Sequence, residues 1–141
     1  MKQATWDALE KVFARTPVLV AGAVPIEGLH AAEKRVGVKL PEDFQQFVAR
    51  YGGAVVGSLP ILGLRKAAVM GSDYSFVDVT EWFRRDGWTP TAEWVVISVD
   101  LGGNPIGIND DGEVWISDHD AGEVRMISPT FEGFVELLLS E

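Results

Sequence analysis

Polar side chains of the kinds that bind metals or move protons are concentrated between Asp100 and Glu123. The stretch contains Asn104, Asn109, Asp110, Asp111, Glu113, Asp118, His119 and Asp120. Carboxylates, amides and imidazoles are ligands for hard cations and groups for proton transfer. Three kinds of chemistry can therefore be tested against their spacing: a calcium loop, a zinc site and general acid–base catalysis.

Neither metal site fits the spacing. A calcium loop needs an Asp at its first position, but aligning its invariant glycine on Gly112 places Gly107 there. A zinc site needs several nitrogen or sulfur ligands, and the chain has no cysteine and only two histidines, His30 and His119. We therefore expect no metal and no cofactor.

Catalysis is the third alternative, because His119 stands between Asp118 and Asp120. Neighbouring residues in a turn point in different directions, and no nucleophile motif accompanies the histidine. The sequence thus favours a protein that is not an enzyme. An enzyme that uses His119 with a neighbouring carboxylate remains as an alternative.

The same carboxylates also suit turns, in which Asp, Asn and Gly bond the local backbone. That explanation covers each residue singly but not their accumulation in three consecutive turns. These turns would form an acidic rim along two ends of a small sheet, and such a rim suits a basic surface. We predict that this rim contacts a protein partner. The predicted contact residues are Asp100, Asn104, Asp110, Asp111, Glu113, Trp115, Asp118, His119, Asp120 and Trp88.

The five tryptophans divide into two groups. Trp6, Trp82 and Trp94 fall at positions that predict burial in the core. Trp88 follows a glycine in a loop, and Trp115 lies on the polar side of its strand, so both are candidate interface anchors. Packing beneath a loop is the alternative for these two.

The acidic turns require an antiparallel meander to position them. Alternating or continuous apolar runs predict strands at 93–99, 106–109, 113–117 and 123–127, joined by turns rich in Asp and Gly. Short apolar runs broken by Gly and Pro predict further strands or edge segments within 54–71. The 93–99 run is largely apolar and predicts a central strand that is buried on both faces.

Helices are predicted on either side of these strands. Residues 5–15 form an amphipathic pattern with Thr5 as cap, and residues 75–85 form another with Ser75 as cap. The C-terminal helix is predicted to begin with Ser128 as cap and Pro129 at its first position. Strands grouped apart from helices indicate a single α+β domain.

The chain is organised around a two-helix unit at 25–53. The first helix is predicted to have Pro25 at its first position and to stop at Gly37, and the second begins after Pro41 and stops at Gly52. The second helix has an apolar stripe that needs a sheet or another helix to cover it: Phe44, Phe47, Val48 and Tyr51.

The order of these motifs resembles the SUKH superfamily, which includes the yeast Smi/Knr regulators. The resemblance rests on Glu33, Val36-Gly37, Leu40-Pro41, Phe44, Phe47 and Gly52-Gly53, followed by Asp100-Leu101-Gly102-Gly103-Asn104. Phe44 and Tyr51 depart from the family's usual Tyr and Asn. The resemblance implies one SUKH domain over residues 1–141, of which 1–24 form an N-terminal helix and linker.

Composition limits the partners. The 21 acidic and 12 basic side chains give a net charge of −9, which repels nucleic acid and attracts basic proteins. The amphipathic N-terminus is not a signal peptide, and no apolar run reaches the roughly 20 residues of a membrane span. A cytoplasmic protein without a membrane or nucleic-acid partner is expected.

The resemblance also implies a function. Bacterial SUKH proteins are largely immunity proteins that neutralise polymorphic or contact-delivered toxins in interbacterial competition. It implies a cognate toxin, basic and of nuclease or deaminase type, bound stoichiometrically by this chain. The alternative is a regulatory scaffold with several weaker partners.

Overall fold

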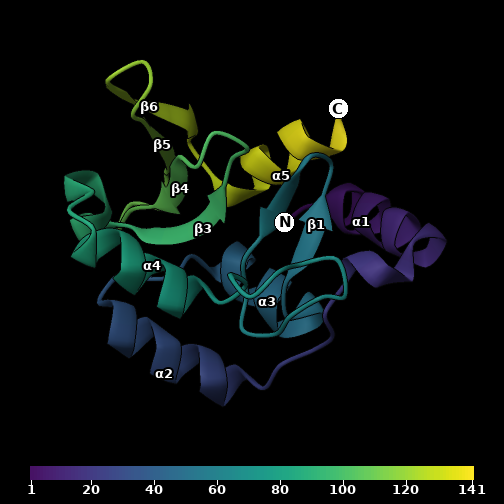
Figure 1. The fold of residues 1–141 in the computed structure, drawn as a ribbon. Coiled ribbons are helices and arrows are strands. Elements are labelled where there is room, and N and C mark those ends of the chain that lie inside the picture. Colours follow the sequence, from purple (N-terminus) through teal and green to yellow (C-terminus); the bar gives the residue numbers. More distant parts are fainter.

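The computed structural model describes residues 1–141 and has the predicted α+β architecture (Figure 1). The five α-helices are α1 (Gln3–Arg15), α2 (Ile26–Val36), α3 (Glu42–Tyr51), α4 (Phe76–Arg85) and α5 (Phe131–Leu139). Two short 3-10 helices are η1 (Pro17–Leu19) and η2 (Thr89–Glu93). The strands are β1 (Ala54–Val56), β2 (Leu59–Ile61), β3 (Val95–Val99), β4 (Pro105–Ile108), β5 (Val114–Asp118) and β6 (Glu123–Ser128).

The predicted meander is confirmed as a four-stranded antiparallel sheet in the order β3-β4-β5-β6. β3 is buried as predicted, but it is an edge strand of this sheet and not a central one. Ile106 pairs with Ile116 and Ile108 with Val114, so these apolar residues share one face of the sheet. β1 and β2 form a separate hairpin, which the Leu62 N–H joins to β3 by a bond to the Ile97 carbonyl. The register places the β3–β4 and β5–β6 loops at one end of the meander and the β4–β5 loop at the other.

One apolar core holds these elements together. Phe44 of α3 makes edge-to-face contacts with Phe76 of α4 and Phe131 of α5, at ring-centroid distances of 5.5 and 5.2 Å. Such contacts contribute beyond the area that the rings bury. α1 adds Trp6 and Phe13 to the same core, and Figure 1 shows it on the side of the molecule away from the β5–β6 hairpin.

The two-helix unit is fixed by carboxylates at its elbow. Glu33 of α2 accepts the Leu40 N–H at 2.7 Å, and Asp110 accepts the Lys39 N–H at 2.9 Å. The first bond closes the elbow, and the second ties it to the β4–β5 loop. Glu33, a motif residue of the sequence, therefore has a structural role.

Gly52 lets three segments meet backbone to backbone. Its φ of 72° is left-handed, and a Cβ there would lie 1.9 Å from the Gly22 carbonyl oxygen. Its own carbonyl accepts the N–H groups of Leu64 and Arg65, both at 2.8 Å. The glycine pair after α3 is thus required by packing as well as by helix termination.

Arg84 of α4 connects the end of α2 with the segment between α4 and β3. Its guanidinium donates to the carbonyls of Val36 at the end of α2, Thr91 in η2 and Trp94 before β3, at 2.8 to 2.9 Å. Burial lowers the pKa of Arg84. The side chain satisfies three carbonyls at once, a function that no sequence pattern indicated.

Two predicted helix starts were wrong. Thr5 lies buried inside α1, which begins at Gln3, because the first turn extends back to Lys2. Thr130 caps α5 by accepting the Gly133 N–H at 3.0 Å, whereas Ser128 ends β6 and accepts the Thr130 N–H. In both cases a tertiary contact moved the boundary: the Lys2 N–H donates to Glu132, and β6 continues pairing to Ser128.

Two further predictions were corrected. Residues 67–70 form a turn and not a strand, although Ala67 and Met70 are buried. Trp82 is 51% exposed, because Phe83 takes the inward position on α4. Trp6 and Trp94 are buried as predicted, and Ser75 caps α4 as predicted.

Ser98 in β3 provides a test of the core. Its hydroxyl is fully buried and has no hydrogen-bond partner. A buried polar group without a partner costs about 1–3 kcal/mol, so we expect Ser98→Ala to leave stability unchanged or raise it by about 1 kcal/mol. Urea unfolding measures the change; a loss of stability would mean that the hydroxyl is bonded. Thr80→Ala is the control and should destabilise, since its hydroxyl accepts the Val96 N–H at 2.8 Å.

Candidate protein-binding surface

The predicted acidic rim lies at two separate ends of the meander. We call residues 100–104 and 118–122 the distal loops, and residues 109–113 the proximal loop. β5 separates them, and at about 3.4 Å per residue its five residues span roughly 14–17 Å. A partner that contacts both ends must therefore cover the length of the sheet.

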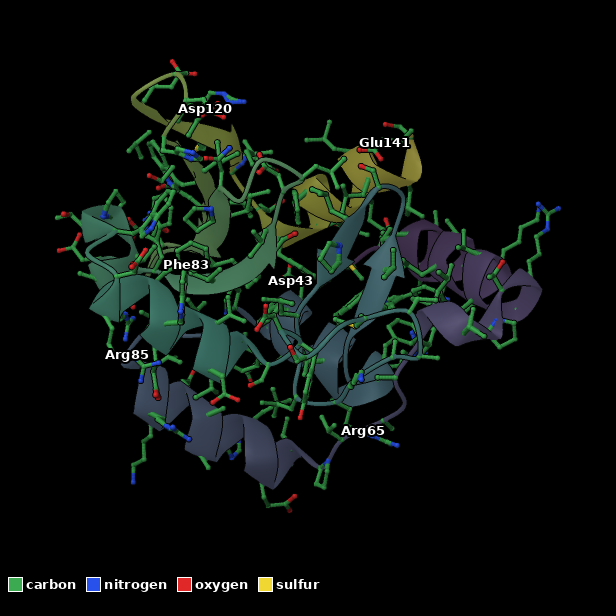
Figure 2. The ribbon with its side chains drawn as sticks, in the orientation of Figure 1. Asp43, Arg65, Phe83, Arg85, Asp120 and Glu141 are labelled. Carbon is green, nitrogen blue, oxygen red and sulfur yellow. The ribbon has the colours of Figure 1, made fainter.

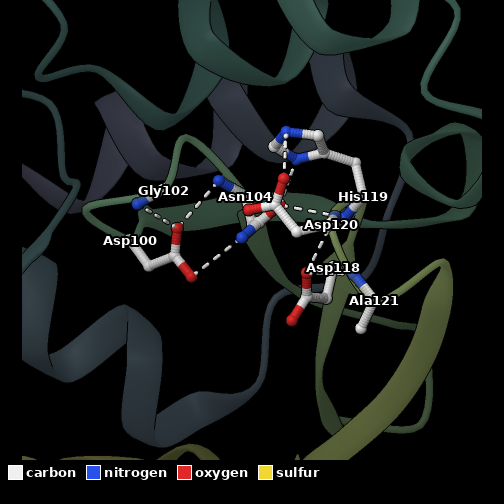
Figure 3. Close-up of polar contacts among 7 residues, drawn as sticks. All are labelled: Asp100, Gly102, Asn104, Asp118, His119, Asp120 and Ala121. Carbon is white, nitrogen blue, oxygen red and sulfur yellow. Dashed lines mark hydrogen bonds and ion pairs between the residues drawn. The ribbon is translucent and has the colours of Figure 1, made fainter.

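In the distal loops, Asp100 and Asn104 are joined in one hydrogen-bond network (Figure 3). Asp100 accepts the N–H groups of Gly102 and Asn104 at 2.9 Å and the Asn104 side-chain amide at 3.1 Å. The side-chain oxygen of Asn104, Oδ1, accepts the backbone N–H of His119 at 3.0 Å and also faces the His119 Nδ1. This network holds the two distal loops together.

Asp118 has a similar local role. Its Oδ1 accepts the N–H groups of Asp120 and Ala121 at 3.0 and 3.1 Å, which fixes the β5–β6 turn (Figure 3). His119 is exposed, and its Nε2 lies 3.3 Å from Asp120 Oδ1. Asp120 is the distal carboxylate that extends furthest into solvent, at the tip of the hairpin (Figure 2).

Trp88 joins the distal loops to α4. Its ring contacts Phe83 and His119 edge to face, at centroid distances of 5.3 and 5.4 Å, and its indole N–H donates to Asp86 at 3.1 Å. The side chain is half-buried. Trp88 therefore packs under the loop, the alternative given for it above, while keeping one edge at the surface.

In the proximal loop the polar side chains also bond one another. Asn109 accepts the N–H groups of Asp111 and Glu113, and Glu113 accepts the Asn109 amide at 2.9 Å and the Trp115 indole N–H at 3.3 Å. The Asp110 carboxylate accepts the backbone N–H of Lys39. The Asp111 carboxylate accepts no hydrogen bond and is exposed, so it is the free anion of this end.

Most predicted rim residues are thus used to hold the turns, and they differ in what they can offer a partner. Asn104 is only 3% exposed, so direct contact through it is excluded while the fold is intact. Asp111 and Asp120 are exposed and are not needed for the backbone of their turns. The remaining carboxylates keep their negative charge at the surface while bonded, and they contribute to the local potential.

A third feature, not predicted from the sequence, lies beside the distal loops. Trp82, Asp73 and Asp78 line a surface hollow of about 550 Å³ that reaches Val99 and Gly103. Asp78 and Trp82 are four residues apart on α4, and this spacing on the polar side of the helix was the available signal. Trp82 was instead predicted to be buried in the core, because it is a large aromatic residue at a helical core position.

The fold and these loops define an α+β domain whose meander presents acidic turns at both ends. The family model of the SMI1 / KNR4 family (SUKH-1) matches residues 24–137, so the chain belongs to that family. Membership is consistent with an immunity-protein role. A search of curated proteins found no match. None of the helices has the length and apolar character needed to cross a bilayer.

Proposed function

We propose that this protein is an immunity protein that binds and neutralises a cognate toxin in the cytoplasm. The observation that carries the proposal is membership of the SMI1 / KNR4 family (SUKH-1), together with acidic loops at both ends of the meander. The mode of action is stoichiometric binding and not turnover. No nucleic-acid or membrane partner is proposed, because a net charge of −9 opposes both phosphate backbones and anionic lipid.

Charge supports a basic toxin, for example a nuclease or deaminase. Surface carboxylates can occupy a basic groove that otherwise holds phosphates, and opposite charge speeds the encounter. The contact residues proposed from the structure are the exposed carboxylates of Asp111 and Asp120 and the exposed edges of Trp88, Trp115 and His119. Asp100, Asp110, Glu113 and Asp118 contribute charge while they hold the loops.

We further propose that residues 1–24 belong to the same domain, although the family match begins at residue 24. Trp6, Leu9 and Phe13 are buried in the common core, and the Tyr51 hydroxyl donates to Glu10 at 2.7 Å. A chain that begins at residue 24 would expose that part of the core. It should lose cooperative unfolding, which calorimetry can measure.

The function is tested with the protein encoded by the neighbouring reading frame, since immunity genes usually lie beside their toxins. Expression of that protein alone should stop growth, and co-expression with this chain should restore it. The purified pair should form a complex of fixed stoichiometry. A regulatory scaffold would instead recover several weak partners in a pull-down, and growth would not depend on the neighbour.

The contribution of each end is tested by charge reversal. We expect Asp111→Lys and Asp120→Lys, combined, to slow association with the toxin about tenfold at low salt and much less at high salt. Rapid-mixing kinetics measure the rates, and the single variants show which end contributes. Glu27→Lys on α2 is the matched control, with the same charge change far from the loops. Unchanged association in the double variant would exclude both carboxylates from the contact.

A further inference from the structure

The hollow beside α4 has features that the proposed contact loops do not explain. It measures about 550 Å³ and lies between α4, the segment that contains Asp73, and the β3–β4 loop at Gly103. Volumes of 300–1,000 Å³ are usual for sites that hold a ligand group. Phe83 forms part of its wall, and Arg85 lies two residues further along the same helix (Figure 2).

Trp82 is the unexpected side chain in this hollow. Half of its surface is exposed, and it contacts Phe83 edge to face at a centroid distance of 4.9 Å. That contact fixes the orientation of the indole against the core and leaves the other side of the residue open. Exposed tryptophans in hollows are frequent anchors of protein interfaces.

The carboxylates of the hollow are free. Asp73 and Asp78 are exposed, and neither forms an ion pair or accepts a hydrogen bond through its carboxylate. Glu81, three residues after Asp78 on α4, differs from them because its carboxylate is paired with the Arg35 guanidinium at 2.6 and 3.1 Å. Asp78 therefore lies one helical turn from Trp82 and has no direct partner, although Arg35, which is paired with Glu81, interacts with its charge at longer range.

Together these groups have the chemistry of a receptor for an organic cation. The face of an indole attracts a guanidinium, and adjacent carboxylates accept its N–H groups. Arg85 is the only cationic residue in the lining, so two carboxylates face one guanidinium. The balance favours a cationic group and disfavours an anionic one.

We propose that this hollow binds an arginine side chain of the partner, with Trp82 against the guanidinium plane and Asp73 and Asp78 accepting its N–H groups. The proposal rests on the proposed function for the identity of the partner, but its chemistry is independent of the toxin. It adds a specific anchor to the charge attraction of the loops. It also extends the contact surface from the distal loops onto α4 through Val99 and Gly103.

The experiment titrates the full chain with a blocked Gly-Arg-Gly peptide and follows the tryptophan indole N–H signals by NMR. The Trp82 signal, assigned by its loss in Trp82→Phe, should shift saturably, with a dissociation constant on the order of 1 mM. The same peptide with citrulline, which is neutral and nearly isosteric with arginine, should bind at least about fivefold more weakly. Equal binding of the two peptides, or no saturable shift at Trp82, would overturn the proposal.

Two variants report the sign of the ligand charge. Asp73→Asn combined with Asp78→Asn should weaken the arginine peptide about fivefold, whereas Arg85→Ala should tighten it about twofold by removing the like charge. The reverse pattern would show a site for anions and would also overturn the proposal. Failure of the peptide to bind leaves the toxin complex testable on its own, and failure of the toxin test leaves this peptide result standing, so the two proposals fail separately.

Discussion

Gly52→Ala is expected to destabilise the protein by about 3–5 kcal/mol, enough to leave a small domain largely unfolded on mild heating. Two costs combine: the left-handed φ of 72° is unfavourable for alanine, and its Cβ would lie 1.9 Å from the Gly22 carbonyl oxygen. That atom belongs to the backbone, so no side chain can rotate away. The free energy of unfolding from urea titration measures the effect.

Gly37→Ala is the matched control. Its φ of 71° is almost the same, but no atom lies within 4 Å of the added Cβ. The control should therefore show only the conformational cost, about 1 kcal/mol. Similar losses in the two variants would mean that the three segments around Gly52 can separate without penalty, and the packing argument would be wrong.

Arg84→Met is expected to cost about 2–4 kcal/mol, because the variant keeps the side-chain bulk and leaves three carbonyls without their charged donor. Those carbonyls belong to Val36, Thr91 and Trp94, in segments that precede and follow α4. Arg84→Lys should recover only part of the loss, since an ammonium group cannot reproduce the planar fork of a guanidinium. Thermal and urea unfolding measure both variants.

Arg85→Ala is the control for Arg84, one position away on the same helix. Arg85 is exposed and forms no ion pair, so its removal should change stability by no more than about 0.5 kcal/mol. If Arg85→Ala lost as much stability as Arg84→Met, the effect would come from the positive charge on α4 and not from the three hydrogen bonds to carbonyls.

The position of Arg84 also matters for the surface. The residue fixes the end of α4, from which Trp82 and Arg85 face the hollow and Phe83 supports Trp88. Loosening this end should disturb the proposed arginine site and the distal loops together. The stability and binding effects of Arg84 variants are thus expected to be linked, unlike those of Asp120.

The sequence predicted the elements well where the signal is local. Pro41, Gly37 and Gly52 mark the limits of α2 and α3 as predicted, whereas Pro25 is the N-cap of α2 and not its first residue. The turns at Gly112 and Gly122 delimit β5. A residue that sets φ or terminates a helix acts through its own backbone, so its effect can be recognised without the rest of the chain. The family motifs were detectable for the same reason.

Tertiary structure alone decided which polar groups remain free. Asp100 and Asp120 both lie in predicted turns, yet the Asp100 carboxylate accepts the backbone N–H groups of Gly102 and Asn104, while the Asp120 carboxylate extends into solvent. Trp82 and Phe83 are adjacent aromatic residues, and only packing against the core determined which one turned outward. The contacts of Arg84 link residues up to 48 positions apart.

The sequence by itself determined the α+β class, the order of helices and strands, the family pattern and the acidic character of the loops. The tertiary structure decided the hollow beside α4, which carboxylates of the rim are bonded within their turns, and the close backbone approach at Gly52. The physical reason is range: backbone dihedral preferences and hydrophobic periodicity are properties of neighbouring residues, whereas burial and hydrogen-bond partnership depend on segments that meet only after folding.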